Sequence, residues 1–289
     1  MSKYSKFNIS LVFVICLLCI VLCSGAFADE ADAVPEFAET PVYIDGLLSL
    51  RGYLLGDTTY ISLETGCAVL GYEYSESVDE ENNALNVIAA DIEFTVEKDK
   101  KYIEVLDRCL FLPDGYVELD GVFMVPIDFI AKLFTLNVVW DDLLGAYDLD
   151  SSTEALLLSG SEYYNEEDLY WLSRIITYES GNQPIEGQIG VGNVVLNRVA
   201  SENFADTVKE VIFEPGQFSP VARKSIYLDP FDKCVLSAKL VLEGYNTVDN
   251  ALYFHQGDYG EKITTENEYF VTKIGVHNFF VSIENLKYM

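Results

Sequence analysis

The hydrophobic pattern changes near residue 150, and this change limits the fold more than any other feature of the sequence. Between residues 41 and 149, short apolar runs alternate with polar breaks, which is typical of short β-strands. After residue 165, apolar residues recur three and four positions apart, which is the period of an amphipathic helix. A chain of 289 residues has room for two modest domains. The sequence therefore predicts an α+β protein with two parts.

The first part is predicted to be a small α+β module over residues 41–149. Expected strands cover residues 42–46, 59–63, 85–89, 92–96, 102–106 and 137–141, and expected helices cover residues 64–70 and 128–134.

The second part, residues 166–282, is predicted to be mainly helical and to end in a β-hairpin. Asn165 is expected to cap the first helix, and the second helix is expected over residues 185–199. Asp206 is a candidate cap for a third helix, and Asp229-Pro230 is expected to open a fourth that Gly244 stops. Two β-like pieces follow at residues 251–255 and 269–281.

The first 28 residues have the pattern of a secretory signal. Lys3 and Lys6 precede an apolar run over residues 9–23, and Ala26 and Ala28 offer the small residues that a signal peptidase reads. The alternative is an uncleaved N-terminal anchor, although the run is short for a membrane span. Cleavage predicts a secreted protein with no membrane contact afterwards. Residues 29–40 and 150–165 are expected to be linkers.

The chain is strongly acidic. It contains 47 Asp and Glu against 18 Lys and Arg, a net charge of −29. Removal of residues 1–28, which contain two lysines and no acids, leaves −31. This charge argues against nucleic acid and anionic membrane surfaces as partners.

Cysteine and histidine give no sign of a metal site or a cofactor. Cys67, Cys109 and Cys234 remain after the signal, and they predict either one bridge between Cys67 and Cys109 or three buried free thiols. The only histidines, His255 and His277, lie far apart in sequence, which makes a zinc centre improbable. Neither a metal nor another cofactor is therefore expected.

Glu179 differs from the many other carboxylates because it ends an apolar helical stripe. The helix is expected to break just after it, at residues 181–184. A carboxyl group at the end of a packed helix is partly desolvated, which raises its pKa towards that of a general acid. From position alone, a solvated side chain at a helix end is equally consistent.

Four motifs in the second part decide between these readings. They are YESGNQPIEGQ followed by VGNVVLNRV (residues 178–188 and 191–199), PGQFSP (215–220), ALYF (251–254) and IGVHNFF (274–280). In this order they resemble the spore cortex-lytic, or cell wall hydrolase, family over about residues 166–282. The resemblance implies a lysozyme-like fold and cleavage of peptidoglycan glycan strands between N-acetylmuramic acid and N-acetylglucosamine. It also places the catalytic glutamate at Glu179.

The same resemblance implies further site residues. Gln217, Phe218 and Ser219 are expected in a sugar-binding loop, and Tyr253 and His277 are expected beside the substrate. Packing within a turn or a hairpin is the alternative for each. Glu186 is a candidate substrate contact, although residues 182–184 interrupt any shared helix with Glu179.

Residues 41–149 resemble a second family, the "stalk" module related to the N-terminal domain of copper amine oxidases. The opening VYIDG (42–46), YISL (60–63), Val125-Pro126 and VWD (139–141) are the segments that match. The resemblance implies attachment or spacing. It makes this module a candidate for contacts with cell-wall or spore-envelope proteins. It implies no copper, because this stretch has no histidine.

Three hypotheses follow for the whole chain. The first is a glycan-cleaving lytic transglycosylase, for which a single carboxylate suffices, whereas ordinary glycosidases use two. The second hypothesis is a hydrolytic muramidase, and the third is a non-catalytic wall-binding protein. The expected partner is peptidoglycan in a cell wall or spore envelope. The sequence leaves open whether this is spore cortex or vegetative wall.

Overall fold

The computed structural model describes residues 38–98, 100–112, 117–152, 156–257 and 268–282. The predicted signal, residues 1–28, and the predicted linker up to residue 37 lie outside these ranges. Within them, no helix is both long and apolar enough to span a membrane.

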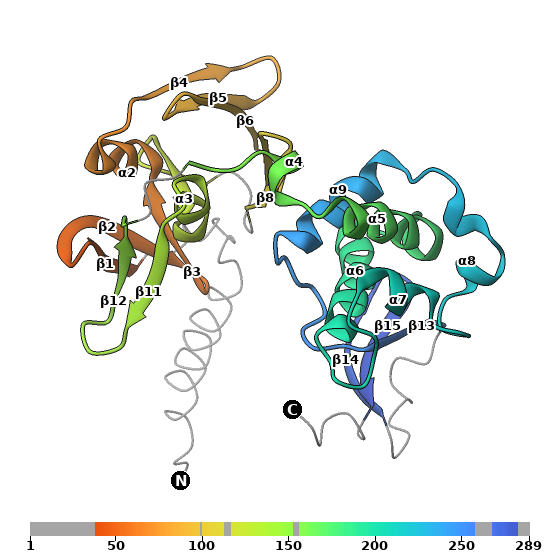
Figure 1. Cartoon of the computed structure of the whole chain (residues 1–289). Helices are drawn as coiled ribbons and strands as arrows, with labels where there is room; N and C mark the ends of the chain where they lie inside the picture. Colours follow the sequence, from red (N-terminus) through yellow and green to blue (C-terminus); the bar gives the residue numbers. More distant parts are fainter. Residues whose placement is uncertain (1–37, 99, 113–116, 153–155, 258–267, 283–289) are drawn as a thin grey trace, which may run out of the picture. The chain divides into compact units, whose positions relative to one another are not determined.

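A seven-stranded sheet forms the centre of the N-terminal module (Figure 1). Its strands lie in the order β11-β12-β1-β2-β3-β10-β9, with β1 and β12 parallel. The bounds are β1 Ala38–Ile44, β2 Leu47–Leu55, β3 Thr58–Ser62, β9 Val117–Leu119, β10 Val122–Pro126, β11 Asn137–Asp141 and β12 Ala146–Asp150. The parallel pair brings the two ends of the module together.

Two helices and two smaller sheets complete this module. They are α2 Leu63–Leu70, α3 Ile127–Leu133, the sheet of β4 Tyr74–Asp79, β5 Ala84–Ala89 and β6 Ile92–Glu97, and the pair β7 Tyr102–Val105 and β8 Arg108–Phe111. Burial alternates along β5 and β6 because one face of their sheet covers the core and the other faces solvent. The predicted strands and helices of this region are confirmed within a few residues.

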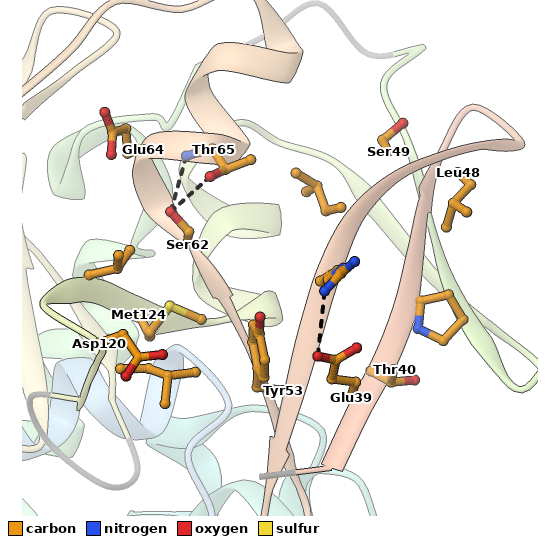
Figure 2. A pocket seen from close by; sticks show the side chains of 15 residues that line it. Glu39, Thr40, Leu48, Ser49, Tyr53, Ser62, Glu64, Thr65, Asp120 and Met124 are labelled. Carbon is orange, nitrogen blue, oxygen red and sulfur yellow. Dashed lines mark hydrogen bonds and ion pairs between the residues drawn. The ribbon is translucent and has the colours of Figure 1, made fainter.

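The face of the seven-stranded sheet is hollowed beside β1, β2 and β10 (Figure 2). The hollow has a volume of about 810 Å³, and its lining mixes apolar groups such as Leu48 and Met124 with carboxylates and hydroxyls. Arg51 lies in it and pairs with Glu39 at 3.5 Å. Both side chains are exposed, so this ion pair contributes little to stability.

The C-terminal domain is mainly helical, as predicted. Its elements are α4 Gly160–Tyr163, α5 Glu166–Ser180, α6 Ile185–Val199, α7 Val208–Phe213, α8 Ser219–Ala222, the 3-10 turn η1 Ser225–Tyr227, α9 Asp232–Leu242, and the strands β13 Tyr253–Gln256, β14 Glu268–Ile274 and β15 His277–Ser282. The strands form one antiparallel sheet in the order β13-β15-β14. The predicted α+β fold class is therefore confirmed.

Two predicted helix starts are wrong. Thr207, not Asp206, caps α7, because the Thr207 hydroxyl accepts the N–H of Glu210 at 3.3 Å. The fourth helix begins at Asp232 rather than at Asp229-Pro230. There the N–H of Phe231 bonds to the Thr177 hydroxyl at 3.1 Å, which holds the preceding residues against α5.

Glycines let α6 pack closely against its neighbours. A Cβ atom at Gly192 would lie 2.8 Å from Val241 of α9, and one at Gly190 would lie 2.8 Å from the Phe279 ring of β15. One turn earlier in α6, the buried Gln188 side chain donates to the carbonyl of Gln183 and accepts from Ser237. The centre of the domain is thus tightly packed around a satisfied polar group.

The three cysteines are free and buried, so the predicted alternative of a Cys67–Cys109 bridge is wrong. They lie in different surroundings. Cys67 belongs to the core of the N-terminal module, whereas Cys109 of β8 packs with the apolar core of α5, α6 and α9. Cys234 is buried in α9, as expected.

A buried ion pair lies beside Cys109. Arg108 of β8 donates two hydrogen bonds of 2.8 Å to the carboxylate of Glu243, at the end of α9. The hydroxyl of Tyr164 donates a third, and Lys132 bonds to the Glu243 carbonyl at 2.7 Å. Glu243 is fully buried, so these donors are needed to hold its charge.

The predicted linker 150–165 also contains α4 and a buried Leu157.

Candidate active site

Glu179 lies in the last turn of α5, one residue before the helix ends. The side chain of Asn165 caps the other end, accepting the N–H groups of Glu167 at 2.9 Å and Asp168 at 3.1 Å. Buried residues between these ends pack α5 against α6 and α9. Pro184 then adopts an extended backbone before α6 begins. The sequence thus places a carboxyl group at the end of a packed helix.

The environment of Glu179 is partly desolvated. Burial raises the pKa of this carboxyl group from 4.5 to about 6. Two groups oppose the effect, namely a hydrogen bond from the backbone N–H of Ser219 and the positive charge of Arg223. Such a group holds a proton in many molecules near neutral pH and can also lose it, which suits acid–base chemistry.

The turn before α8 positions the N–H of Ser219. Gly216 has a φ of +83°, which residues with a side chain rarely adopt. The N–H of Gln217 closes the turn on the carbonyl of Glu214 at 3.2 Å. Phe218 follows as the buried N-cap residue of α8. The buried phenylalanine therefore anchors the residue whose N–H reaches Glu179.

Aromatic side chains from β13 and β15 meet Phe218. The rings of Phe218 and Phe254 lie 6.3 Å apart, and Phe254 meets His277 edge-on at 5.2 Å. Tyr253 stacks on Phe280 at 5.5 Å, its partner across the two strands. Phe218 and His277 therefore belong to one aromatic cluster through Phe254, whereas the ring of Tyr253 contacts Phe280 and Phe204.

His277 is a buried member of this cluster. Burial, followed by the charge of His255, lowers its pKa, so the ring is neutral near pH 7. Its Nε2 lies 3.3 Å from the side-chain nitrogen of Gln256, and its Nδ1 has no hydrogen-bond partner among the described residues.

Two other predicted residues lie differently. Gln217 is exposed on the turn. Glu186 lies in the first turn of α6, where its charge raises the pKa of Tyr245 and its carbonyl accepts from Thr247. Glu186 therefore faces Tyr245. In the part of the chain that the structure describes, no carboxylate shifts the pKa of Glu179.

The sequence interpretation gave Arg198 no role, although it stands within the motif at residues 191–199. It is buried near the end of α6, and its Nε donates to the carbonyl of Leu252 at 2.8 Å. Its guanidinium lies 5.2 Å from the Phe218 ring and 5.3 Å from the Tyr253 ring. The signal available in the sequence was that Arg198 is the one basic residue of a helix whose other residues are apolar, glycine, amide or, at Glu186, acidic.

Metal ligation finds no support in the described residues, where no three His, Cys, Asp or Glu side chains are grouped to hold an ion. The hollow of the N-terminal module shares no residue with the surroundings of Glu179. We assign the candidate site to Glu179, because acid–base chemistry requires a carboxyl group with a perturbed pKa and burial perturbs this one.

Two family models match the chain, the Cell Wall Hydrolase model over residues 182–280 and the copper amine oxidase N-terminal domain model over residues 47–145. The spore cortex-lytic enzyme of Bacillus cereus is 34% identical over 116 residues, which are 40% of this chain and 45% of that protein. The Bacillus subtilis enzyme of the same name is 29% identical, over 40% of this chain and 38% of its own length. The chain thus spans less than half the length of the curated relatives it matches.

A solved structure entitled as the catalytic domain of the germination-specific lytic transglycosylase SleB from Bacillus anthracis is 34% identical. The match covers 40% of this chain and 95% of that structure, with a TM-score of 0.37. The two family models cover most of the sequence motifs, although the first match begins at residue 182, after Glu179, and the second at residue 47, after the VYIDG segment. The chain therefore carries a C-terminal domain of the cell wall hydrolase family, preceded by a domain of the copper amine oxidase N-terminal family.

Proposed function

We propose that the C-terminal domain cleaves the glycan strands of peptidoglycan between N-acetylmuramic acid and N-acetylglucosamine, with Glu179 as acid and base. The observation that carries this proposal is the half-buried Glu179 carboxyl group. Its pKa is raised to about 6, and it accepts the Ser219 N–H next to an aromatic cluster. Aromatic rings and neutral polar groups suit a sugar substrate. The proposed substrate contacts are the exposed Gln217 and Ser219 and the half-buried Tyr253 and Glu186, while the buried Phe218 and His277 are proposed to support them from behind.

The proposed reaction is an intramolecular transfer. Protonated Glu179 gives its proton to the glycosidic oxygen, and the bond from that oxygen to the anomeric carbon of muramic acid breaks. The Glu179 carboxylate then takes the proton of the muramic acid 6-hydroxyl group. The 6-oxygen forms a bond to the anomeric carbon of the same sugar and yields a 1,6-anhydro end. Glu179 finishes protonated, so the group is regenerated.

The surroundings of Glu179 favour transfer over hydrolysis. Most glycosidases that hydrolyse use a second carboxylate as nucleophile or as a base for water. In the described structure, the nearest candidate in sequence, Glu186, faces Tyr245 instead. A hydrolytic muramidase remains the alternative reaction, and a non-catalytic wall-binding protein remains the alternative class.

Digestion of purified peptidoglycan followed by mass spectrometry tests the proposal. We expect 1,6-anhydromuramic ends, whereas reducing muramic ends would indicate a muramidase and intact strands a binding protein. Glu179→Gln should abolish release of fragments. The matched control is Asp168→Asn, which changes another half-buried carboxyl of α5 with a raised pKa and should leave the rate unchanged. Normal release by Glu179→Gln would contradict the site.

The names of the curated relatives favour spore cortex as the substrate, and the name of the solved structure favours germination as the occasion. Secretion to the cell wall or spore envelope, with attachment through the N-terminal module, completes the proposal. Comparing digestion of cortex with digestion of vegetative wall, each purified from one spore-forming strain, tests this part. Equal rates on both would contradict a cortex-specific role.

A further inference from the structure

Arg198 joins three elements around the candidate site. It extends from α6, its Nε donates to the Leu252 carbonyl just before β13, and its guanidinium lies among the rings of Phe204, Phe218 and Tyr253. The distances to the ring centroids are 5.0, 5.2 and 5.3 Å. The side chain is 4% exposed. A buried guanidinium held in this way restricts the positions of the aromatic rings that pack against it.

The ring of Phe218 is the link from Arg198 to Glu179. Phe218 is buried, its ring lies 5.2 Å from the guanidinium and 6.3 Å from the Phe254 ring, and Ser219, the next residue, donates its N–H to Glu179. A displacement of the Phe218 ring would therefore carry the Ser219 N–H with it. Arg198 itself neither bonds to Glu179 nor shifts its pKa.

Burial lowers the pKa of Arg198, and the charges of Tyr253 and Glu214 oppose this effect only in part. One carboxylate oxygen of Glu214 and the Nη1 of Arg198 are buried without hydrogen-bond partners in the described residues. A charge in such surroundings is costly unless another charge compensates it. The attraction between the Glu214 carboxylate and the guanidinium therefore favours a position of residues 214–218 close to the end of α6.

We propose that Arg198 is a positioning residue that, through the Phe218 ring, holds the Ser219 N–H on the carboxylate of Glu179. An effect of Arg198 on catalysis rests on the proposed function, whereas its effect on the hydrogen bond between Ser219 and Glu179 does not. Lysine is not an adequate substitute, because it lacks both the planar group that packs among rings and the Nε that reaches the Leu252 carbonyl.

The experiment measures the pKa of Glu179 directly. The full chain is labelled with ¹³C at the glutamate carboxyl carbon and titrated by NMR, with Glu179→Gln to assign the signal. Arg198→Met keeps the apolar stem and removes the charge, and Arg198→Lys keeps the charge. The matched control is Arg174→Met, which removes another buried arginine that stacks on a tyrosine in the same domain. Arg174 does not contribute to the shift at Glu179.

We expect Arg198→Met and Arg198→Lys to raise the pKa of Glu179 by roughly half a unit to one unit, because the carboxylate loses a hydrogen bond. Arg174→Met should leave it unchanged. A folded Arg198 variant with an unchanged or lowered pKa would overturn the proposal. If Arg198→Met does not fold, Phe204→Leu loosens the guanidinium more gently and must raise the pKa in the same direction. The titration needs no substrate, so it separates this proposal from the proposed activity, which the peptidoglycan digest tests.

Discussion

Replacing Ser219 by proline removes a single hydrogen bond from Glu179. Ser219 is the first residue of α8, a position that proline tolerates because no helical bond uses its N–H. Phe218 has φ −123° and ψ 125°, which is the extended conformation that a residue before proline prefers. The backbone can therefore accept the change, while the N–H that reaches Glu179 is lost.

The expected shift follows from the energy of that hydrogen bond. A bond to a charged group contributes about 1.5 to 3 kcal/mol, and the partial exposure of Glu179 argues for the lower end. About 1.4 kcal/mol corresponds to one pKa unit. Since the N–H stabilises the charged form, its loss should raise the pKa of Glu179 from about 6 to roughly 7.

Two measurements check this shift. NMR titration of the labelled Glu179 carboxyl should show the higher pKa. If Glu179 is the general acid, the alkaline limb of the rate–pH profile on peptidoglycan should move up by about one unit. Ser219→Ala is the control, because it removes the hydroxyl and keeps the N–H. An unchanged pKa in folded Ser219→Pro would refute the role of this bond, and a lowered pKa would show that the loop, rather than the N–H, sets the acidity.

Three further predictions concern stability. Because folding raises the pKa of Glu179, the free energy of unfolding falls as pH rises from 4.5 to about 6. Urea unfolding should therefore show Glu179→Gln to be more stable than the parent by about 1 kcal/mol at pH ~8 and equal to it at pH ~3. Glu243→Gln should cost about 3 to 5 kcal/mol in thermal unfolding, because Arg108 is left with a buried unpaired charge; a loss under ~1 kcal/mol would contradict this. In thermal unfolding, Gly192→Ala should lose about 1 kcal/mol or more of stability by overpacking. Gly187→Ala, whose Cβ would meet its nearest atoms at an ordinary 3.4 Å, should be neutral or stabilising.

The end of α5 and the start of α6 could be predicted because local residue types determine them. Asn165 caps α5 as expected, and α6 spans the predicted residues 185–199. Pro184 cannot continue a helix and is favoured just before one, so the break after Glu179 follows from the sequence alone.

Other features could not be predicted because they depend on distant contacts. Asp229-Pro230 is a good helix start locally, yet the Thr177 hydroxyl takes the N–H of Phe231 from another helix and delays α9. The position of Cys109 in the C-terminal core depends on the pairing of Arg108 with Glu243, 135 residues away. Periodicity within one segment contains no information about such contacts.

A single carboxyl group that serves as both acid and base must not hold its proton too firmly. Burial alone would raise the pKa of Glu179 further, which would favour proton donation and weaken the carboxylate form. The Ser219 N–H and the charge of Arg223 oppose burial and keep the pKa near 6. A second carboxylate close by would raise it again by like-charge repulsion. The opposing effects at Glu179 are therefore those that a one-acid transfer requires, and Arg198 fixes one of them through Phe218.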